Sequence, residues 1–224
     1  MCIRDSNIIM NSSIESSNKQ KPNPFLDKSL WLLFTVNLFT IFLAISQEWK
    51  LTTLMWIYWF QSITIGFFNF IRILQLKEFT TENYKINNVQ AESTQYTKIS
   101  SAFFFLFHFG GFHFVYLLFL FVFSIAGIFG EAPSINEFLW ILITSVLFFI
   151  NHLFSYIYNK PKDNQKPNIG TMVFYPYARI LPMHLTIVGF GFIINNSLLL
   201  FLILKTFADC IMHVVEHRYL RASK

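Results

Sequence analysis

The sequence has few cysteines and few charged residues, and both shortages exclude classes of protein. Cys2 and Cys210 are the only cysteines among 224 residues, and because Cys210 lies in an apolar segment, no disulfide framework is expected. Charged residues make up only 13% of the chain. The formal net charge is +5, but no dense basic run or basic helix face occurs, which argues against a nucleic-acid-binding protein.

Apolar and aromatic residues take the place of the missing charge. The chain is 54% hydrophobic and 19% aromatic, with 29 Phe, and its mean hydropathy is +0.47. A helix needs about 20 mostly apolar residues to cross the hydrocarbon core of a membrane. Such segments use most of the length, so the composition predicts one all-α, polytopic membrane bundle without a separate soluble domain. The lipid bilayer is the predicted partner, and protein partners are left open.

Six segments are long and apolar enough to be predicted as transmembrane helices. They are Ser29–Ser46, Leu51–Leu74, Lys98–Ile128, Glu137–Tyr158, a segment from near Pro176 to about Asn195, and Ser197–Arg218. Polar linkers at Gln75–Thr97 and Lys160–Gly170 separate some of them. The transmembrane domain is thus predicted to cover residues 29–218, with a disordered tail at 1–28 and a short tail at 219–224. Residues 1–6 resemble a translated sequencing adapter and are interpreted as a gene-model artefact.

The positions of the basic residues predict the orientation. Lys and Arg concentrate in the N-terminal tail, near the two long linkers and at the C-terminal end, whereas the loops after the first, third and fifth segments contain only Lys50. Loops rich in Lys and Arg stay on the cytoplasmic side of a membrane. Both termini are therefore predicted to be cytoplasmic, with the protein in the bacterial inner membrane.

The last segment carries ionisable residues at four-residue spacing. Lys205, Asp209, His213 and His217 share one helix face. Charge is costly in lipid, so this face is expected to meet protein, water or an ion. The simplest interpretation of Lys205 and Asp209 is a structural ion pair within the helix. The alternative is a proton or ion relay.

Several histidines are predicted to lie in one layer of the membrane. At 1.5 Å per residue, they and Asp209 fall about 8 to 14 Å from the cytoplasmic end of their spans, which predicts a polar site in the cytoplasmic half of the bilayer. The alternative is that each histidine is hydrogen-bonded separately. The residues of this layer are His108, His152, His184, Asp209 and His213, with Gln61 and His113 deeper.

Metal binding is one interpretation of this layer. His213, Glu216 and His217 match the H-x-x-E-H pattern in which two histidines bind zinc and the glutamate activates water. We favour a looser form, in which His213 and other histidines bind the metal, Asp209 orients a ligand, and the reaction is metal-dependent hydrolysis. The candidate metal or haem ligands are His108, His152, His184 and His213; the candidate relay or orienting residues are Asp209, Lys205, Gln61 and Arg179; weaker candidates are Glu216, His217 and His113.

Other functions stay open on the sequence. A b-type haem protein that transfers electrons would use His108 with His184 or His213 as axial ligands. A transporter or channel component would use the ionisable residues as a relay. A structural subunit would use them only to lock helix packing. Arg179 fits either an interfacial position or contact with an anionic group, and whether the protein is an enzyme is undecided.

An ordered set of short motifs resembles a known family. The motifs are Tyr58-Trp59-x-Gln61, Gly66-x-x-Asn69 with Arg72, Phe104-Phe105-x-x-His108-x-Gly110-Gly111-Phe112, Pro176-Tyr177-x-Arg179 with His184, and Lys205-Thr206-x-x-Asp209 with His213. In this order they resemble an uncharacterised prokaryotic membrane family, domain of unknown function 6498. The resemblance covers the second to the sixth segment and implies the membrane architecture. Its pattern has Glu where this chain has Gln61, and it implies no reaction.

Overall fold

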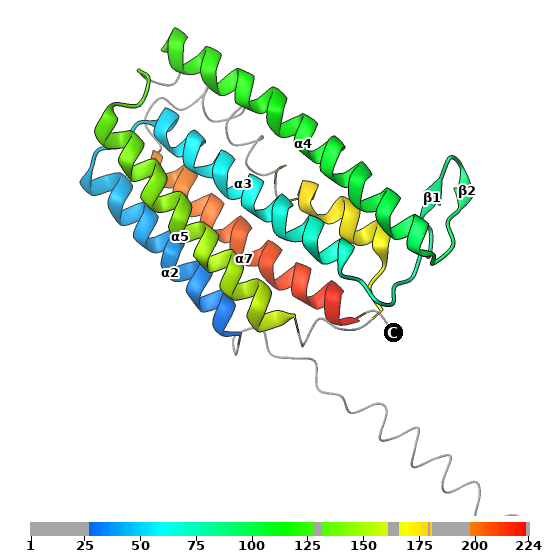
Figure 1. Cartoon of the computed structure of the whole chain (residues 1–224). Coiled ribbons are helices and arrows are strands. Elements are labelled where there is room, and N and C mark those ends of the chain that lie inside the picture. Colours follow the sequence, from blue (N-terminus) through cyan, green and yellow to red (C-terminus); the bar gives the residue numbers. More distant parts are fainter. Residues whose placement is uncertain (1–26, 128–130, 161–165, 179, 181–197, 223–224) are drawn as a thin grey trace, which may run out of the picture.

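The computed structural model describes residues 27–127, 131–160, 166–178, 180 and 198–222, without the side chains of 200, 201 and 217–222. These residues form a helical bundle (Figure 1). Four helices are long and apolar enough to cross a membrane, which agrees with the prediction of a helical membrane protein. They are α2 (Lys28–Ser46), α3 (Leu51–Leu74), α4 (Gln95–Ala126) and α5 (Ile135–Asn159). Helix α7 (Leu198–Ala222) and helical residues 169–178 complete the described part.

Local capping explains where the helices begin. The side chain of Asp27 accepts a hydrogen bond from the Ser29 amide at the start of α2. Thr94 accepts one from the Thr97 amide, so α4 begins ahead of the predicted Lys98. Ser134 and Glu137 form a reciprocal capping box that starts α5.

The fifth predicted span begins differently from our expectation. We predicted a start near Pro176, but the chain is already helical from residue 169. The physical reason is a cap at Asn168, whose Oδ1 accepts a hydrogen bond of 3.1 Å from the Thr171 amide. Most of the remaining fifth span lies outside the described residues, as do several side chains of the sixth. The count of six spans therefore stays a prediction.

The bundle has two distinct ends. At the first, which we call the basic end, α3 and α5 end and α4 begins. The C-terminal half of α7 also lies near this end (Figure 1). Arg72, Lys98 and Lys160 are at this end. At the opposite end, an exposed ion pair of 2.9 Å joins Lys50 to Glu131.

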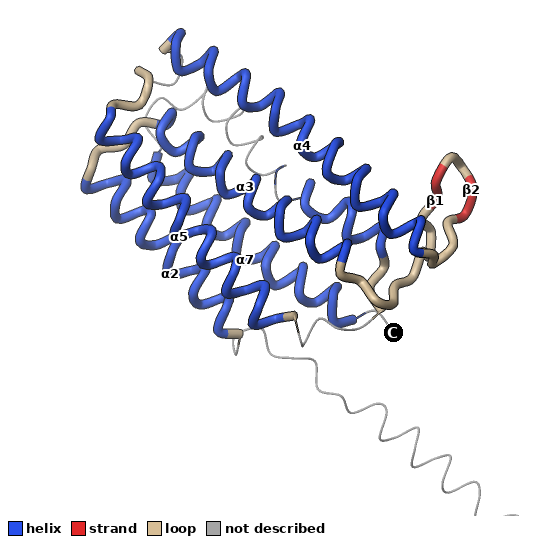
Figure 2. The backbone as a smooth tube through the Cα atoms, viewed as in Figure 1, coloured by secondary structure: helices blue, strands red, loops and turns tan. Residues whose placement is uncertain are grey.

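The linker between α3 and α4 is folded against the basic end. Two short strands, β1 (Lys85–Ile86) and β2 (Val89–Gln90), form a hairpin in it, the only strands in the described part of the chain (Figure 2). Asn87 and Asn88 turn the hairpin with positive φ angles of 51° and 64°, which Asn tolerates better than most residues. Phe79 and Tyr84 are buried in an apolar cluster with residues of α4 and of 169–173. This linker therefore covers one end of the bundle.

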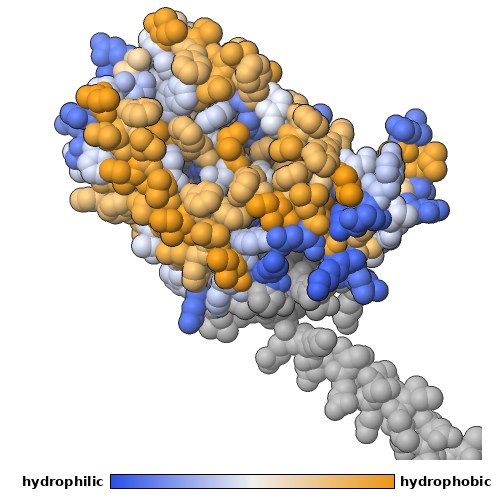
Figure 3. Space-filling view, viewed as in Figure 1, coloured by the Kyte–Doolittle hydropathy of each residue, from blue (hydrophilic) through white to orange (hydrophobic). Residues whose placement is uncertain are grey.

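The outer surface of the bundle is strongly apolar. Phe107 on α4 is 74% exposed, and many other Phe, Leu and Ile side chains of α2 to α5 are also exposed. In Figure 3 these residues form a broad apolar band that gives way to hydrophilic residues at the basic end. Soluble proteins rarely expose apolar surface on this scale. The surface is therefore that of a protein suited to insertion in a membrane.

Candidate functional site

The ionisable face of α7 turns into the bundle. Lys205, Asp209 and His213 follow one another at intervals of one helical turn, and all three are buried. They face residues of α2 and α3, and Lys205 also faces Phe148 of α5. The prediction that this face meets protein is thus confirmed for these three residues. The side chain of His217 lies outside the described part.

Lys205 is at the centre of the first polar group, which we call the lysine network. Its Nζ lies 2.8 Å from Oδ2 of Asp209, which confirms the predicted i,i+4 ion pair. Nζ also donates to Oε1 of Gln61 and, over 3.3 Å, to Oδ1 of Asn37. Gln61 in turn donates from Nε2 to Asp209 Oδ2 over 3.1 Å. One amide therefore binds both members of the ion pair.

Aromatic rings complete the surroundings of the ammonium. Nζ of Lys205 lies 3.9 Å from the ring centroid of Tyr58 and 4.8 Å from that of Phe148. A ring face attracts a cation most strongly where water is excluded. Three oxygens and two rings from α2, α3, α5 and α7 thus surround one positive charge. Because a buried charge is costly unless it is paired and hydrogen-bonded, these contacts account for how Lys205 is accommodated.

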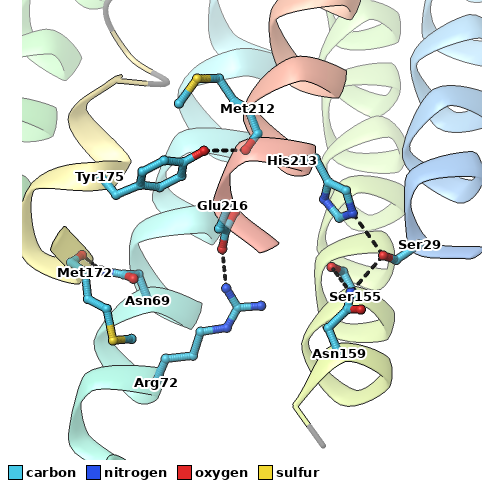
Figure 4. A network of polar contacts seen from close by, with 10 residues as sticks. All are labelled: Ser29, Asn69, Arg72, Ser155, Asn159, Met172, Tyr175, Met212, His213 and Glu216. Carbon is cyan, nitrogen blue, oxygen red and sulfur yellow. Dashed lines mark hydrogen bonds and ion pairs between the residues drawn. The ribbon is translucent and has the colours of Figure 1, made fainter. Parts of the chain in front are cut away.

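A second network lies closer to the basic end (Figure 4). Ser29 Oγ donates to Oδ1 of Asp27 over 2.6 Å. Asn159 Nδ2 donates to the same Oγ over 2.8 Å, and His213 Nε2 lies 2.9 Å from it. A hydroxyl has a single proton, so with that proton on the Asp27 bond, His213 donates through Nε2. The network joins α2, α5 and α7.

A third set of contacts holds the helical residues 169–178 and α7 to α3. Arg72 and Glu216 form an ion pair, and Tyr175 donates from its hydroxyl to the Met212 carbonyl (Figure 4). Asn69 Nδ2 donates to the Met172 carbonyl over 2.9 Å. The carboxylate of Glu216 therefore pairs with Arg72, and no contact in this set supports the predicted role of Glu216 in activating water.

Three of the candidate histidines, His108, His113 and His213, contact different partners. His108 is exposed on α4, and its Nδ1 lies 2.8 Å from the hydroxyl of Tyr177. His113 is buried, with Nδ1 2.9 Å from the Phe109 carbonyl of its own helix. His152 is buried on α5, and His213 contacts Ser29. These contacts place His108 and His213 against different partners, and depth alone does not determine rotation about a helix axis. The convergence of all four candidate ligands stays a prediction.

The described side chains do not form the predicted metal centre. Among them, no group of three or more His, Cys, Asp or Glu residues is arranged to hold a metal ion. Of the proposed haem ligands, His108 contacts Tyr177 and His213 contacts Ser29. His184 and Arg179 lie outside the described residues, so the combinations that include them remain untested.

Some residues of the two central networks escaped the sequence interpretation of the site. Asn37 carried a signal, since it is the one strongly polar residue inside the first apolar segment. Ser29 and Asn159 gave none, because Ser and Asn are common at helix ends. Tyr58 stood beside Gln61 in a family motif but was not assigned to the site, and Phe148 could not be distinguished from the other Phe residues of a chain with 29 Phe.

The comparisons with known proteins identify a family without an assigned activity. A family described as DUF6498, a family of unknown function, matches residues 19–224. No curated protein matches the chain, and no solved structure matches it.

Proposed function

The chain belongs to the DUF6498 family, whose function is unknown, and we propose that it is an integral membrane protein that exchanges protons at the buried pair of Lys205 and Asp209. The observation that carries this proposal is the lysine network, in which Lys205 Nζ lies 2.8 Å from Asp209 Oδ2 within an apolar bundle. Ionisable residues inside a membrane protein are costly and are most often retained for function.

The proton can move along the bond between the two groups. Transfer from the ammonium of Lys205 to the carboxylate of Asp209 gives an amine and a carboxylic acid, which are both neutral and cost less to bury. Gln61 stabilises either form, because its oxygen accepts from Lys205 and its NH₂ group reaches Asp209. Tyr58 is a further titratable group that faces Lys205, while its contacts Asn37 and Phe148 do not titrate.

The orientation belongs to the same proposal. Six spans place both termini in the cytoplasm of a bacterial inner membrane, with the basic end on the cytoplasmic side. Arg72, Lys98 and Lys160 at that end support this arrangement. Single cysteines at Lys85 in the hairpin and Ala132 near the opposite end test it, in a background that carries both Cys2→Ala and Cys210→Ala. A membrane-impermeant maleimide should label Ala132→Cys in intact cells and Lys85→Cys only in inverted vesicles; the reverse pattern would overturn the orientation.

Proton flux is the direct test of the function. The protein is reconstituted in liposomes that contain a pH-sensitive dye, and a potassium diffusion potential drives proton movement. The wild type should acidify or alkalise the lumen faster than empty liposomes, and Asp209→Asn should abolish the difference. Glu131→Gln, which removes an exposed carboxylate at the opposite end, is the control and should keep the flux. Wild-type liposomes that match empty ones, at verified incorporation, would refute the proposal.

A folded variant without the ion pair separates this function from a purely structural one. Replacing both members, as in Lys205→Met with Asp209→Leu, leaves no unpaired buried charge and can preserve the fold. We expect a folded protein that has lost proton flux. Retained flux in this double variant would show that the pair is not the proton site. No contact among the described residues favours metal-dependent hydrolysis or haem-based electron transfer over this proposal.

A further inference from the structure

The ends of α3 and α5 meet in a small polar group at the basic end. Nζ of Lys160 donates to Oε1 of Gln75 over 2.7 Å, and the Tyr156 hydroxyl donates to the same oxygen over 2.5 Å. The Tyr156 ring also lies near two cations, with its centroid 5.8 Å from Cζ of Arg72 and 5.5 Å from Nζ of Lys160. The group is formed by two neighbouring helices rather than by one flexible loop.

The positive charge of Lys160 is not balanced by a described carboxylate. Arg72 pairs with Glu216, and Lys166 pairs with Glu78. Lys160 is exposed and, within the described ranges, hydrogen-bonds only to a neutral amide. The oxygen of that amide already accepts two hydrogen bonds, so Gln75 can bind a ligand only by donating from its NH₂ group. The remaining N–H bonds of Lys160 lie beside it.

An aromatic seam runs from this polar group into the apolar band. The ring centroids of Tyr156 and Phe68 are 5.5 Å apart, and those of Phe68 and Phe149 are 5.4 Å apart. Phe149 on α5 and Phe67 on α3 are exposed on the two sides of the seam. Figure 3 shows the apolar band ending at hydrophilic residues at this end of the molecule. Apolar surface thus adjoins, at the boundary of the band, a positive charge that no described carboxylate balances.

We propose that the seam between α3 and α5 binds an anionic phospholipid. Its phosphate accepts hydrogen bonds from Lys160 and Gln75, and one acyl chain lies over Phe67 and Phe149. A lipid matches both properties of the site, because only a molecule with an anionic head and an apolar chain fills the charged end and the aromatic surface together. A zwitterionic lipid fits less well, since its own ammonium is repelled by Lys160.

Lipid titration of the full-length protein tests this proposal. Native mass spectrometry in detergent compares phosphatidylglycerol with phosphatidylcholine of the same acyl chains, at fixed salt. Phosphatidylglycerol should bind more tightly to the wild type. Lys160→Gln should weaken its binding about fivefold, as expected for loss of one interfacial cation. The matched control is Lys85→Gln, which removes the same charge from the hairpin and should leave the affinity unchanged.

Four outcomes would overturn the proposal. The first is equal affinity for the two lipids. The second is an equal effect of Lys160→Gln and Lys85→Gln, which would indicate a diffuse charge effect. The third is displacement of the lipid by millimolar inorganic phosphate, which would make a free anion the ligand. If Lys160 only stabilises the C-terminus of α5, Lys160→Gln should lower the Tm equally with either lipid, which also contradicts lipid binding. Tyr156→Phe keeps the ring, frees Gln75 from one bond and should retain the selectivity for phosphatidylglycerol.

Discussion

The carboxylate of Asp209 and the ammonium of Lys205 are bridged by the single side-chain amide of Gln61, whose two polar atoms bond one partner each. This relationship fixes the ion pair relative to α3 as well as along α7. Asn37 adds a bond from α2. The ammonium of Lys205 therefore links α2, α3 and α7. Removing the ion pair should affect stability and proton exchange in separable ways.

Breaking the ion pair should destabilise the protein strongly. Asp209→Asn leaves the ammonium of Lys205 without its carboxylate, and loss of one partner of a buried pair costs about 3–5 kcal/mol. We expect a large fall in Tm, measured in detergent by intrinsic fluorescence. Ile211→Ala on the exposed side of α7 is the control and should change little. The double change Lys205→Met with Asp209→Leu should recover most of the loss, and a double variant as unstable as Asp209→Asn would contradict this account.

Ser29 should matter for stability although it is a small residue. Its hydroxyl donates to Asp27 and receives a hydrogen bond from Asn159, with His213 on the same oxygen. Ser29→Ala removes all three contacts, and leaving buried polar groups unsatisfied costs about 1–3 kcal/mol. Chemical or thermal denaturation should show this loss. Ser46→Ala, at the exposed end of the same helix, should be close to neutral.

The sequence was sufficient to predict an all-helical protein with helices apolar enough to cross a membrane, because that signal is compositional. Leu51–Leu74 was predicted with the bounds that the structure gives, since polar residues end the apolar run on both sides. The segment after it was predicted to be a polar linker, yet Phe79 and Tyr84 are buried there. Isolated apolar residues between polar ones give no periodic pattern, so their packing could not be read from the sequence.

The candidate site was predicted only in part. The spacing of Lys205 and Asp209 predicted their ion pair, because residues four apart on a helix are neighbours. Spacing within one helix could not reveal that Gln61 and Asn37 reach the same ammonium. It also could not show that His108 turns to Tyr177 while His213 turns to Ser29. Contacts between helices depend on rotation about each axis, and a single sequence does not specify that angle.

Gly66 should tolerate no side chain, because α3 and α4 approach closely there. A Cβ atom at Gly66 would lie 2.3 Å from Cε1 of Phe109, whereas nothing lies within 4 Å of one at Gly111. Gly66→Ala should therefore destabilise the protein by about 1–3 kcal/mol through overpacking. Gly111→Ala on α4 should be neutral or stabilising by about 0.5–1 kcal/mol. Adding Phe109→Leu to Gly66→Ala should restore part of the stability, and no recovery would place the strain elsewhere.

The linker between α3 and α4 is attached to residues 166–169, and this attachment should weaken in acid. The hydrogen bond from Lys166 holds the pKa of Glu78 below its ordinary value of 4.5. A carboxyl with a lowered folded-state pKa contributes stability above its unfolded value, and that contribution is lost as pH falls through the folded value. The exposed pair should add little, so the effect is local. The Thr80 amide donates to the Pro167 carbonyl, and the Ile169 amide donates to the Thr80 carbonyl. Hydrogen exchange at these two amides, corrected for intrinsic rates, should show reduced protection below about pH 4.5.

The sign of this pH dependence can be checked with one variant. Lys166→Gln removes the cation, so the pKa of Glu78 should return toward its ordinary value and the acid-induced change in protection should shrink. Lys85→Gln, on the neighbouring hairpin, should leave the change as it is in the wild type. Equal acid profiles in the wild type and Lys166→Gln would show that Glu78 does not hold the linker. Because Glu78 and Lys166 lie outside the four apolar helices, this test reports on the linker independently of the lysine network.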